Sequence, residues 1–212
     1  MIHAYDKTYL ERARNSLGIM LDFAVNELQI NLSKFWEMFL QSDICKQFEH
    51  GDPNVLAGMS GIEMTYAVAG ECFRSEKPAS TMTRSEEYWL GWALAYYQWY
   101  TDLSFSEITK IASIEDIRNL YSPYHEMDIR QFCDKMNELY SKHNTTTKLK
   151  KLRLAAGMSQ SELAESAEVP LRTIQQYEQR QKNINKAQAE TVLKLAKALF
   201  CSPVDLMEKV VV

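Results

Sequence analysis

Apolar side chains recur at three- and four-residue steps through the first part of the chain, which is the spacing of one buried face of an α-helix. From Asp6, a predicted N-cap, to Leu28 these positions are Tyr9, Leu10, Ala13, Leu17, Met20, Leu21 and Ala24. The same spacing predicts helices over 33–41 and 44–48. Because no run of alternating β-branched residues is present, the pattern favours an all-α protein.

Hydroxyl and acidic residues mark the starts of further helices. Ser60 with Glu63 three residues later predicts a capping box. The residues predicted to cap short amphipathic helices further along the chain are Ser104, Ser113 and Asp128. We therefore expect the first two thirds of the chain to be a bundle of helices.

The most aromatic run, 85–103, predicts one longer helix that begins near Ser85. Its aromatic residues could form a stacking platform for a ligand or a base. They could equally make a central helix that is buried almost all round. We favour the buried helix, because the polar partners that a platform needs are absent beside the run.

Charge and polarity divide the chain into two predicted domains. Residues 1–142 hold 13 Lys+Arg and 21 Asp+Glu, a net charge of −8, whereas residues 143–212 hold 11 and 7, a net charge of +4. The polar stretch 141–148 predicts a boundary near residue 144. We expect an acidic all-helical domain over 1–144, with a candidate subdomain break at 71–84, and a basic domain over 145–212.

The basic domain shows the pattern of five short helices. Thr146 or Thr147 is the predicted cap of the first helix, and Gly157 its stop. Ser159 and Glu162 predict a capping box for the second helix. The third is predicted over 170–179 with Pro170 at its first position, the fourth over 187–199, and the fifth from 202 to 207.

This pattern resembles the Cro/lambda-repressor-like (XRE-type) helix-turn-helix family over about 60 residues. The residues that carry the resemblance are Leu152, Arg153, Ser159, Gln160, Glu162, Leu163, Ala164, Val169, Ile174, Tyr177, Glu178, Leu195, Ala196, Ala198, Leu199 and Leu206. The turn at 167–168 lacks the glycine of many relatives. The resemblance implies a five-helix DNA-binding domain, and an ion pair between Arg153 and Glu178 that holds the third helix in place.

Helix 170–179 carries side chains suited to the DNA major groove. Arg172 can bond guanine, Gln175 or Gln176 can bond adenine, and Leu171 can contact a thymine methyl group. The residues expected at the DNA backbone are Ser159, Gln160, Thr173, Arg180, Lys182 and Asn183. The predicted partner is therefore double-stranded DNA, bound by a homodimer.

Other chemistry has little support in the sequence. The four cysteines are scattered, no paired histidine spacing exists, and no GxGxxG, P-loop or GxSxG motif is present. His125 lies among carboxylates, but a loop histidine of this kind is more often solvated than a metal ligand. No apolar run reaches the roughly 18 residues of a membrane span. We expect no enzymatic activity, cofactor, metal or membrane contact, and a cytoplasmic location.

The sequence favours a transcriptional regulator, most simply a repressor. The N-terminal part resembles helical domains that precede such modules in bacterial regulators, some of them beside toxin–antitoxin loci. An antitoxin-like regulator that binds a partner protein through residues 1–144 and represses its own operon is therefore an alternative. A sensor that binds a small ligand between the N-terminal helices is another.

Overall fold

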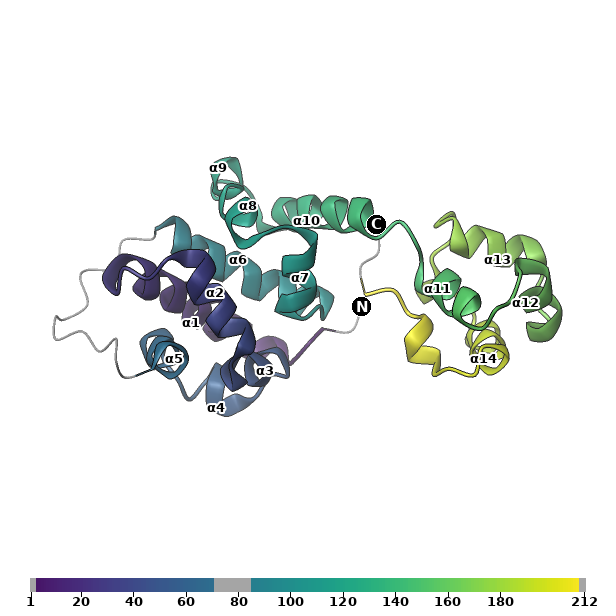
Figure 1. Ribbon diagram of the computed structural model, residues 1–212, viewed down its shortest axis with the longest axis horizontal. Helices are drawn as coiled ribbons and strands as arrows, with labels where there is room; N and C mark the ends of the chain where they lie inside the picture. The colour runs from purple at the N-terminus through teal and green to yellow at the C-terminus, as the bar shows by residue number, and fades with distance from the viewer. Residues whose placement is uncertain (1–2, 71–84, 210–212) are drawn as a thin grey trace. The chain divides into compact units, whose positions relative to one another are not determined.

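The computed structural model describes residues 3–70 and 85–209, and all regular structure within them is helical (Figure 1). The chain divides into two compact units, Met1–Leu139 and Tyr140–Val212. The all-α prediction is confirmed. The predicted subdomain break at 71–84 lies outside the described residues.

The first predicted helix is present in three consecutive parts. Asp6 accepts a hydrogen bond from the Thr8 amide and caps the 3-10 turn η1 (Lys7–Tyr9). The α-helix α1 (Leu10–Asp22) follows, and the chain then widens into the π-helical turn η2 (Phe23–Glu27). The positions predicted to be apolar form its buried face, with Ala13, Leu17 and Met20 fully buried.

Helix α1 is crossed at close range by α5 (Gly61–Ala69) and α6 (Glu86–Thr101). A Cβ atom added at Gly91 of α6 would lie 2.4 Å from the Leu17 carbonyl oxygen, and one added at Gly61 of α5 would lie 2.4 Å from that of Ser16. Because both obstacles are backbone atoms, glycine permits these two helix crossings. The capping box predicted at Ser60 and Glu63 is confirmed.

Helix α6 is mostly buried, in agreement with the buried helix that the sequence favoured over an aromatic stacking platform. Trp89, Tyr97 and Trp99 are buried, and Ser85 caps the helix by accepting the Tyr88 amide. One stripe stays half-buried at four-residue steps, namely Tyr88, Trp92, Tyr96 and Tyr100. The guanidinium of Arg14 lies 3.4 Å from the centroid of the Trp92 ring, which covers part of this stripe.

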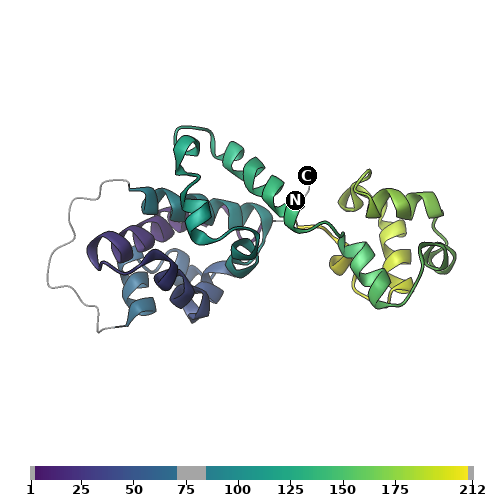
Figure 2. The same ribbon diagram turned by 45° about the horizontal axis from the view of Figure 1, so that its top comes forward.

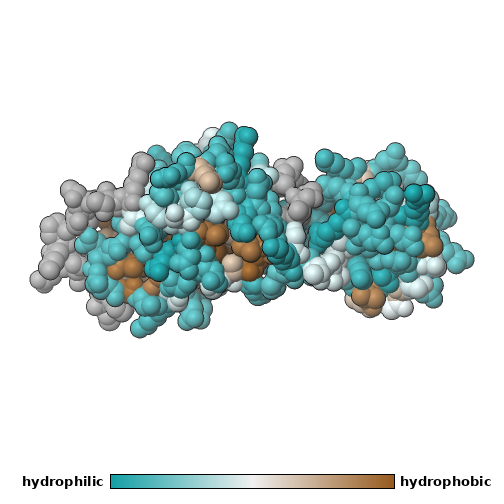
Figure 3. Space-filling view, turned by 90° about the horizontal axis from the view of Figure 1, so that it is seen from above, coloured by the Kyte–Doolittle hydropathy of each residue, from teal (hydrophilic) through white to brown (hydrophobic). Residues whose placement is uncertain are grey.

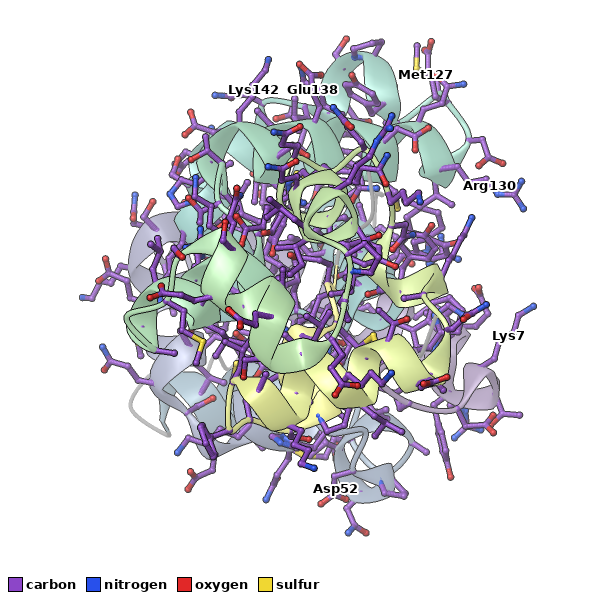
Figure 4. The ribbon with its side chains drawn as sticks, turned by 90° about the vertical axis from the view of Figure 1, so that its right-hand side faces the viewer. Lys7, Asp52, Met127, Arg130, Glu138 and Lys142 are labelled. Carbon is purple, nitrogen blue, oxygen red and sulfur yellow. The ribbon has the colours of Figure 1, made fainter. Side chains whose placement is uncertain are left out.

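The remaining helices of this unit are short and capped. They are α2 (Leu32–Gln41), α3 (Asp43–Glu49), α4 (Pro53–Leu56), α7 (Phe105–Ile111), α8 (Ile114–Arg118), α9 (Tyr121–Tyr124) and α10 (Ile129–His143). The Asp52 carboxylate caps α4 by accepting the Asn54 amide, and neither α4 nor α9 was among the predicted helices. Figure 4 shows Lys7, Asp52 and Arg130 of this unit extending outward.

The C-terminal unit contains α11 (Lys148–Ala155), α12 (Gln160–Ala167), α13 (Leu171–Glu178), η4 (Ile184–Lys186), α14 (Ala189–Ala198) and η5 (Pro203–Leu206), shown in green to yellow in Figure 2. Its core includes Leu149, Leu163, Ile174, Leu195 and Leu206. These side chains come from each of the longer helices and from η5, so the core joins all of them.

Several predicted boundaries of this unit are wrong by a few residues. Helix α10 continues to His143, so the first part of the predicted linker 141–148 is helical. Pro170 is the N-cap of α13 instead of its first residue. The fourth helix starts later than predicted, after η4, and the fifth is a 3-10 helix. Helix ends fray and often form 3-10 turns, as at η4 and η5, so the apolar spacing does not fix the terminal residue.

Candidate nucleic-acid interface

Helices α12 and α13 and the turn between them form the predicted helix-turn-helix. Ser159 accepts the Glu162 amide, and the Glu162 carboxylate accepts the Ser159 amide at 2.7 Å, so the predicted capping box of α12 is confirmed. Glu168 takes the left-handed conformation with φ 51° at the end of α12. The turn at 167–168 thus takes a left-handed residue without a glycine, and Val169 beside it is buried.

Helix α13 has one face in the core and one face in solvent. Ile174 is fully buried and Glu178 is 7% exposed, whereas Arg172 is exposed and Leu171 is 37% exposed. Gln175 and Gln176 are half-buried. Among the described residues, the side chains of Arg172, Gln175 and Gln176 have no hydrogen-bond partner. These donors and acceptors are available for base edges in a major groove.

Arg153 of α11 and Glu178 of α13 form a buried, bidentate ion pair. Their side chains are 8% and 2% exposed. Arg153 Nε and Nη2 donate to the two Glu178 carboxylate oxygens at 2.7 and 3.0 Å, and Nη1 donates to the Met158 carbonyl at 2.6 Å. All three guanidinium nitrogens are therefore used, and the end of α13 is fixed against α11.

Gln160, the first residue of α12, joins the same group. Its Nε2 donates to Glu178 Oε2 at 2.7 Å. Burial acts to raise the pKa of the Glu178 carboxyl, but the hydrogen bonds from Arg153 and Gln160 outweigh it, and the pKa lies below its usual value. One carboxylate thus ties together three helices. Gln160 was predicted at a phosphate, and its second amide hydrogen still leaves it a donor for one.

The other residues predicted at the DNA backbone differ in their exposure and in whether they already make hydrogen bonds within the protein. Lys182 is exposed and Thr173 is half-buried. Asn183 caps η4 by accepting the Asn185 amide at 2.8 Å. Arg180, left-handed with φ 58°, donates from Nη2 to the Asn144 carbonyl at 3.0 Å. The side chains of Asn183 and Arg180 therefore already have internal partners, unlike those of the predicted base readers.

The segment that leads into α11 is held by residues distant in sequence. Thr147 is 3% exposed and caps α11. Glu208 accepts the Lys148 amide at 2.7 Å, and its own amide donates to Asn185 Oδ1 at 2.9 Å. The sequence contained no local signal for the pairs Gln160–Glu178, Arg180–Asn144 or Glu208–Lys148, because their partners are 18 to 60 residues apart.

Other candidate chemistry is not assembled in the described parts of the chain. The His125 ring stacks on Tyr121 with centroids 4.0 Å apart, and its Nδ1 lies 2.9 Å from the Tyr121 carbonyl oxygen. No group of three or more His, Cys, Asp or Glu side chains within 3–70 and 85–209 could hold a metal ion. No helix in these ranges is both long and apolar enough to cross a bilayer.

Surface cavities of the N-terminal unit include the following two. One of about 490 Å³ is lined by Lys46, Gln47, His50, Gly51, Asp52 and Pro53. The other, of about 330 Å³, is lined by Tyr124, Gln131, Asp134, Lys135 and Glu138.

Comparison with known proteins bears on the C-terminal unit. Residues 149–206 match the family model described as helix-turn-helix. No curated protein and no solved structure matches the chain. The matched range begins at Leu149, the first buried residue of α11, and ends at Leu206, the last core residue of the unit. Residues 149–206 are a helix-turn-helix domain of the Cro/lambda-repressor type.

Proposed function

We propose that the protein is a sequence-specific transcriptional regulator that acts as a repressor and reads the DNA major groove with α13. The observation that carries the proposal is the set Arg172, Gln175 and Gln176, which lie on one helix without internal partners while Arg153 and Glu178 fix that helix in place. A helix so presented can place its N-terminal side chains against base edges.

The proposed base readers are Leu171, Arg172, Gln175 and Gln176, and the proposed backbone contacts are Ser159, Gln160, Thr173 and Lys182. For Arg180 and Asn183 a phosphate contact would have to add to, or replace, the hydrogen bonds that they make to the protein. One such unit spans only a few base pairs. We therefore propose a homodimer on two half-sites about one helical turn, roughly 34 Å, apart.

Selection of bound DNA from a random pool with the full-length protein tests base readout. We expect an enriched palindrome, and absence of any enriched sequence would refute the proposal. Arg172→Ala should cost about 1–3 kcal/mol at one position of each half-site and relax specificity there. The matched variant Lys182→Ala should weaken binding to all sequences alike and reduce the salt dependence of the affinity.

Repression is tested separately, by transcription from a promoter that carries the selected palindrome. We expect lower transcription with the wild-type chain than with Arg172→Ala. Higher transcription would make the protein an activator while leaving base readout intact.

The role of the N-terminal unit stays a prediction. Its excess of acidic residues and the half-buried aromatic stripe of α6 are the features that a partner protein could use, since interfaces are enriched in Tyr, Trp and Arg. An antitoxin-like function would require such a partner, and co-expression with the neighbouring gene product, followed by purification of the pair, would test it.

A further inference from the structure

Arg180 lies just past the C-terminal end of α13, in a loop that folds back onto that helix. Its amide donates to the Tyr177 carbonyl at 3.1 Å, and the Lys182 amide donates to the Gln176 carbonyl at 3.1 Å. Arg180 is left-handed, with φ 58°, a conformation that glycine or asparagine adopts more readily than arginine. The helix end therefore does not require an arginine, and the role of this residue lies in its side chain.

The Arg180 guanidinium reaches the C-terminal end of α10. Its Nη2 donates to the Asn144 carbonyl at 3.0 Å, 36 residues away in sequence. Asn144 follows the last residue of α10, and its amide donates to the Tyr140 carbonyl at 2.8 Å. Because carbonyl groups without helical partners give this end of a helix a partial negative charge, a cation is stabilising there. Arg180 therefore caps α10 from the loop that follows α13.

Helix α10 and a short connector join this contact to the rest of the chain. Phe132 of α10 is fully buried and belongs to the N-terminal unit, whereas residues 140–143 of the same helix belong to the C-terminal unit. The connector is the segment 144–147 between α10 and α11. Arg180 holds its first residue, and its last residue, Thr147, is buried and caps α11. The connector is thus fixed at both ends within the C-terminal unit.

The guanidinium has donors left for a second partner. A guanidinium carries five N–H groups, and that of Arg180 makes one hydrogen bond and no ion pair within residues 3–70 and 85–209. Arg153, by contrast, uses all three of its nitrogens, two of them on a carboxylate. Arg180 is held by a neutral carbonyl, so its charge is not compensated. A phosphate can accept two parallel hydrogen bonds from such a group.

The position of the loop indicates which anion would bind. Helix α13 has eight residues, about 12 Å of helix, which is roughly the width of the DNA major groove. A residue just past the end of a helix in that groove lies near the phosphates that border it. In the space-filling view most of the C-terminal unit is hydrophilic, and apolar colour is confined to small spots (Figure 3). Such a surface suits the polar, charged contacts of a DNA backbone.

We infer that the Arg180 guanidinium bridges the end of α10 and a DNA backbone phosphate. The inference rests on the proposed DNA binding and deepens it, because the bridge ties the connector 144–147 to the bound DNA. The Asn144 carbonyl takes one N–H group and the phosphate takes others, so neither contact displaces the other. By linkage, DNA that holds the guanidinium also holds the connector, and a partner that orders the end of α10 strengthens DNA binding in turn.

Hydrogen exchange of the full-length chain tests the bridge, with each chain compared free and saturated with a duplex that carries the selected palindrome. In the wild type we expect DNA to slow exchange at residues 140–147 about tenfold, the effect of a hydrogen bond to a charged group. Arg180→Asn should lose this protection and still fold, since asparagine accepts the left-handed conformation but is too short to reach both partners. Arg180→Lys should lose it as well, because an ammonium group on a flexible stem lacks the planar fork of donors.

Lys182→Asn is the matched control, since Lys182 is exposed in the same loop and makes no contact with α10. At saturation this variant should show the protection of the wild type at residues 140–147. Arg180→Asn and Lys182→Asn should each reduce the slope of log affinity against log salt by about 0.9, because each removes one phosphate contact. Arg180→Lys keeps the charge and should keep the slope.

Exchange at residues 140–147 that DNA leaves unchanged or accelerates in the wild type overturns the inference. Equal protection in Arg180→Asn overturns it too, as does a salt slope that Arg180→Asn leaves unaltered. A mixed-sequence duplex then separates the bridge from base readout, because phosphate contacts do not depend on sequence. If no sequence is selected from the random pool but this duplex protects 140–147 through Arg180, the sequence-specific function fails and the bridge stands. If a palindrome is selected and 140–147 is not protected, base readout stands and the bridge fails.

Discussion

The two units differ in where their polar side chains are directed. In the N-terminal unit the two buried charged side chains of the described residues, Arg14 and Glu87, have partners within the unit. Arg14 stacks on Trp92 and donates to Glu11 at 2.8 Å, and Glu87 pairs with Arg118 at 3.5 Å. In the C-terminal unit Arg153 is used in the same internal way, but Arg172 and two neighbouring glutamines on α13 are not. The exposed side of α13 therefore carries hydrogen-bonding groups that the fold itself does not use.

The comparison also shows that burial of charge alone does not identify function. Arg14 and Arg153 are both nearly buried, with 8% of each side chain exposed. Burial lowers the pKa of Arg14, whereas the hydrogen bond to Glu178 raises that of Arg153. Arg14 thus contacts an aromatic ring and an exposed carboxylate, whereas Arg153 contacts a buried carboxylate. Each holds helices together, and neither is available to a ligand.

The largest expected effect comes from breaking the ion pair of the C-terminal unit. Glu178→Gln leaves the buried Arg153 charge without its counter-ion and should cost about 3–5 kcal/mol of unfolding free energy in that unit. Hydrogen exchange of the α11–α13 amides in the full-length chain should accelerate, while exchange in α1 and α6 should not. An unchanged stability of the C-terminal unit would show that Glu178 does not fix α13.

Gly91→Ala should destabilise the N-terminal unit by about 2 kcal/mol. The added methyl group would meet the Leu17 carbonyl oxygen at 2.4 Å, so α1 and α6 must move apart. At an exposed helical site the same change would stabilise by about 1 kcal/mol, because alanine favours helix. Urea unfolding therefore tests the close crossing, because a lower unfolding free energy for Gly91→Ala indicates the clash and a higher one indicates its absence. Ala67→Val on the exposed face of α5 serves as control and should change stability little.

Arg14→Met keeps the aliphatic stem but removes the cation above the Trp92 ring. We expect a loss of about 1–2 kcal/mol in the N-terminal unit, the range of a desolvated cation–π contact. Arg130→Met, on the exposed side of α10, should be close to neutral. Equal effects of the two changes in thermal unfolding would mean that the ring contact contributes nothing.

The smallest effect is an acid dependence of the C-terminal unit. The pKa of Glu178 is lower in the folded chain than its usual value of about 4.3. The carboxylate therefore stabilises the fold fully above that pH, and this contribution is lost as the pH falls through the folded pKa. Stability measured from pH 6 downward should decline more steeply for wild type than for Glu178→Gln. Parallel curves would contradict the assignment.

The sequence predicted most of the helices because their signals are local. The capping boxes at Ser60 and Ser159 each depend on residues three apart, and both are present. The spacing of many apolar positions together identified the C-terminal family. Helix α9 was not predicted, and its Ser122 has a non-helical conformation that no periodicity reveals.

The remaining features depend on contacts between distant residues. The closeness of α1 and α6 follows from Gly18 and Gly91 meeting across the crossing, although each alone is an ordinary helical glycine. Gln160 was predicted at a phosphate, but its side chain donates to Glu178, which is 18 residues away in sequence. Phe200 has the apolar character of a core residue, and only its 93% exposure shows that it is not one.

The location of the tryptophans has a spectroscopic consequence. All four, Trp36, Trp89, Trp92 and Trp99, belong to the N-terminal unit. Intrinsic tryptophan emission therefore reports on the folding of the N-terminal unit, and Trp92 has a guanidinium against its ring. Unfolding of the N-terminal unit can thus be followed by tryptophan emission, while unfolding of the C-terminal unit, which has no tryptophan, needs another signal.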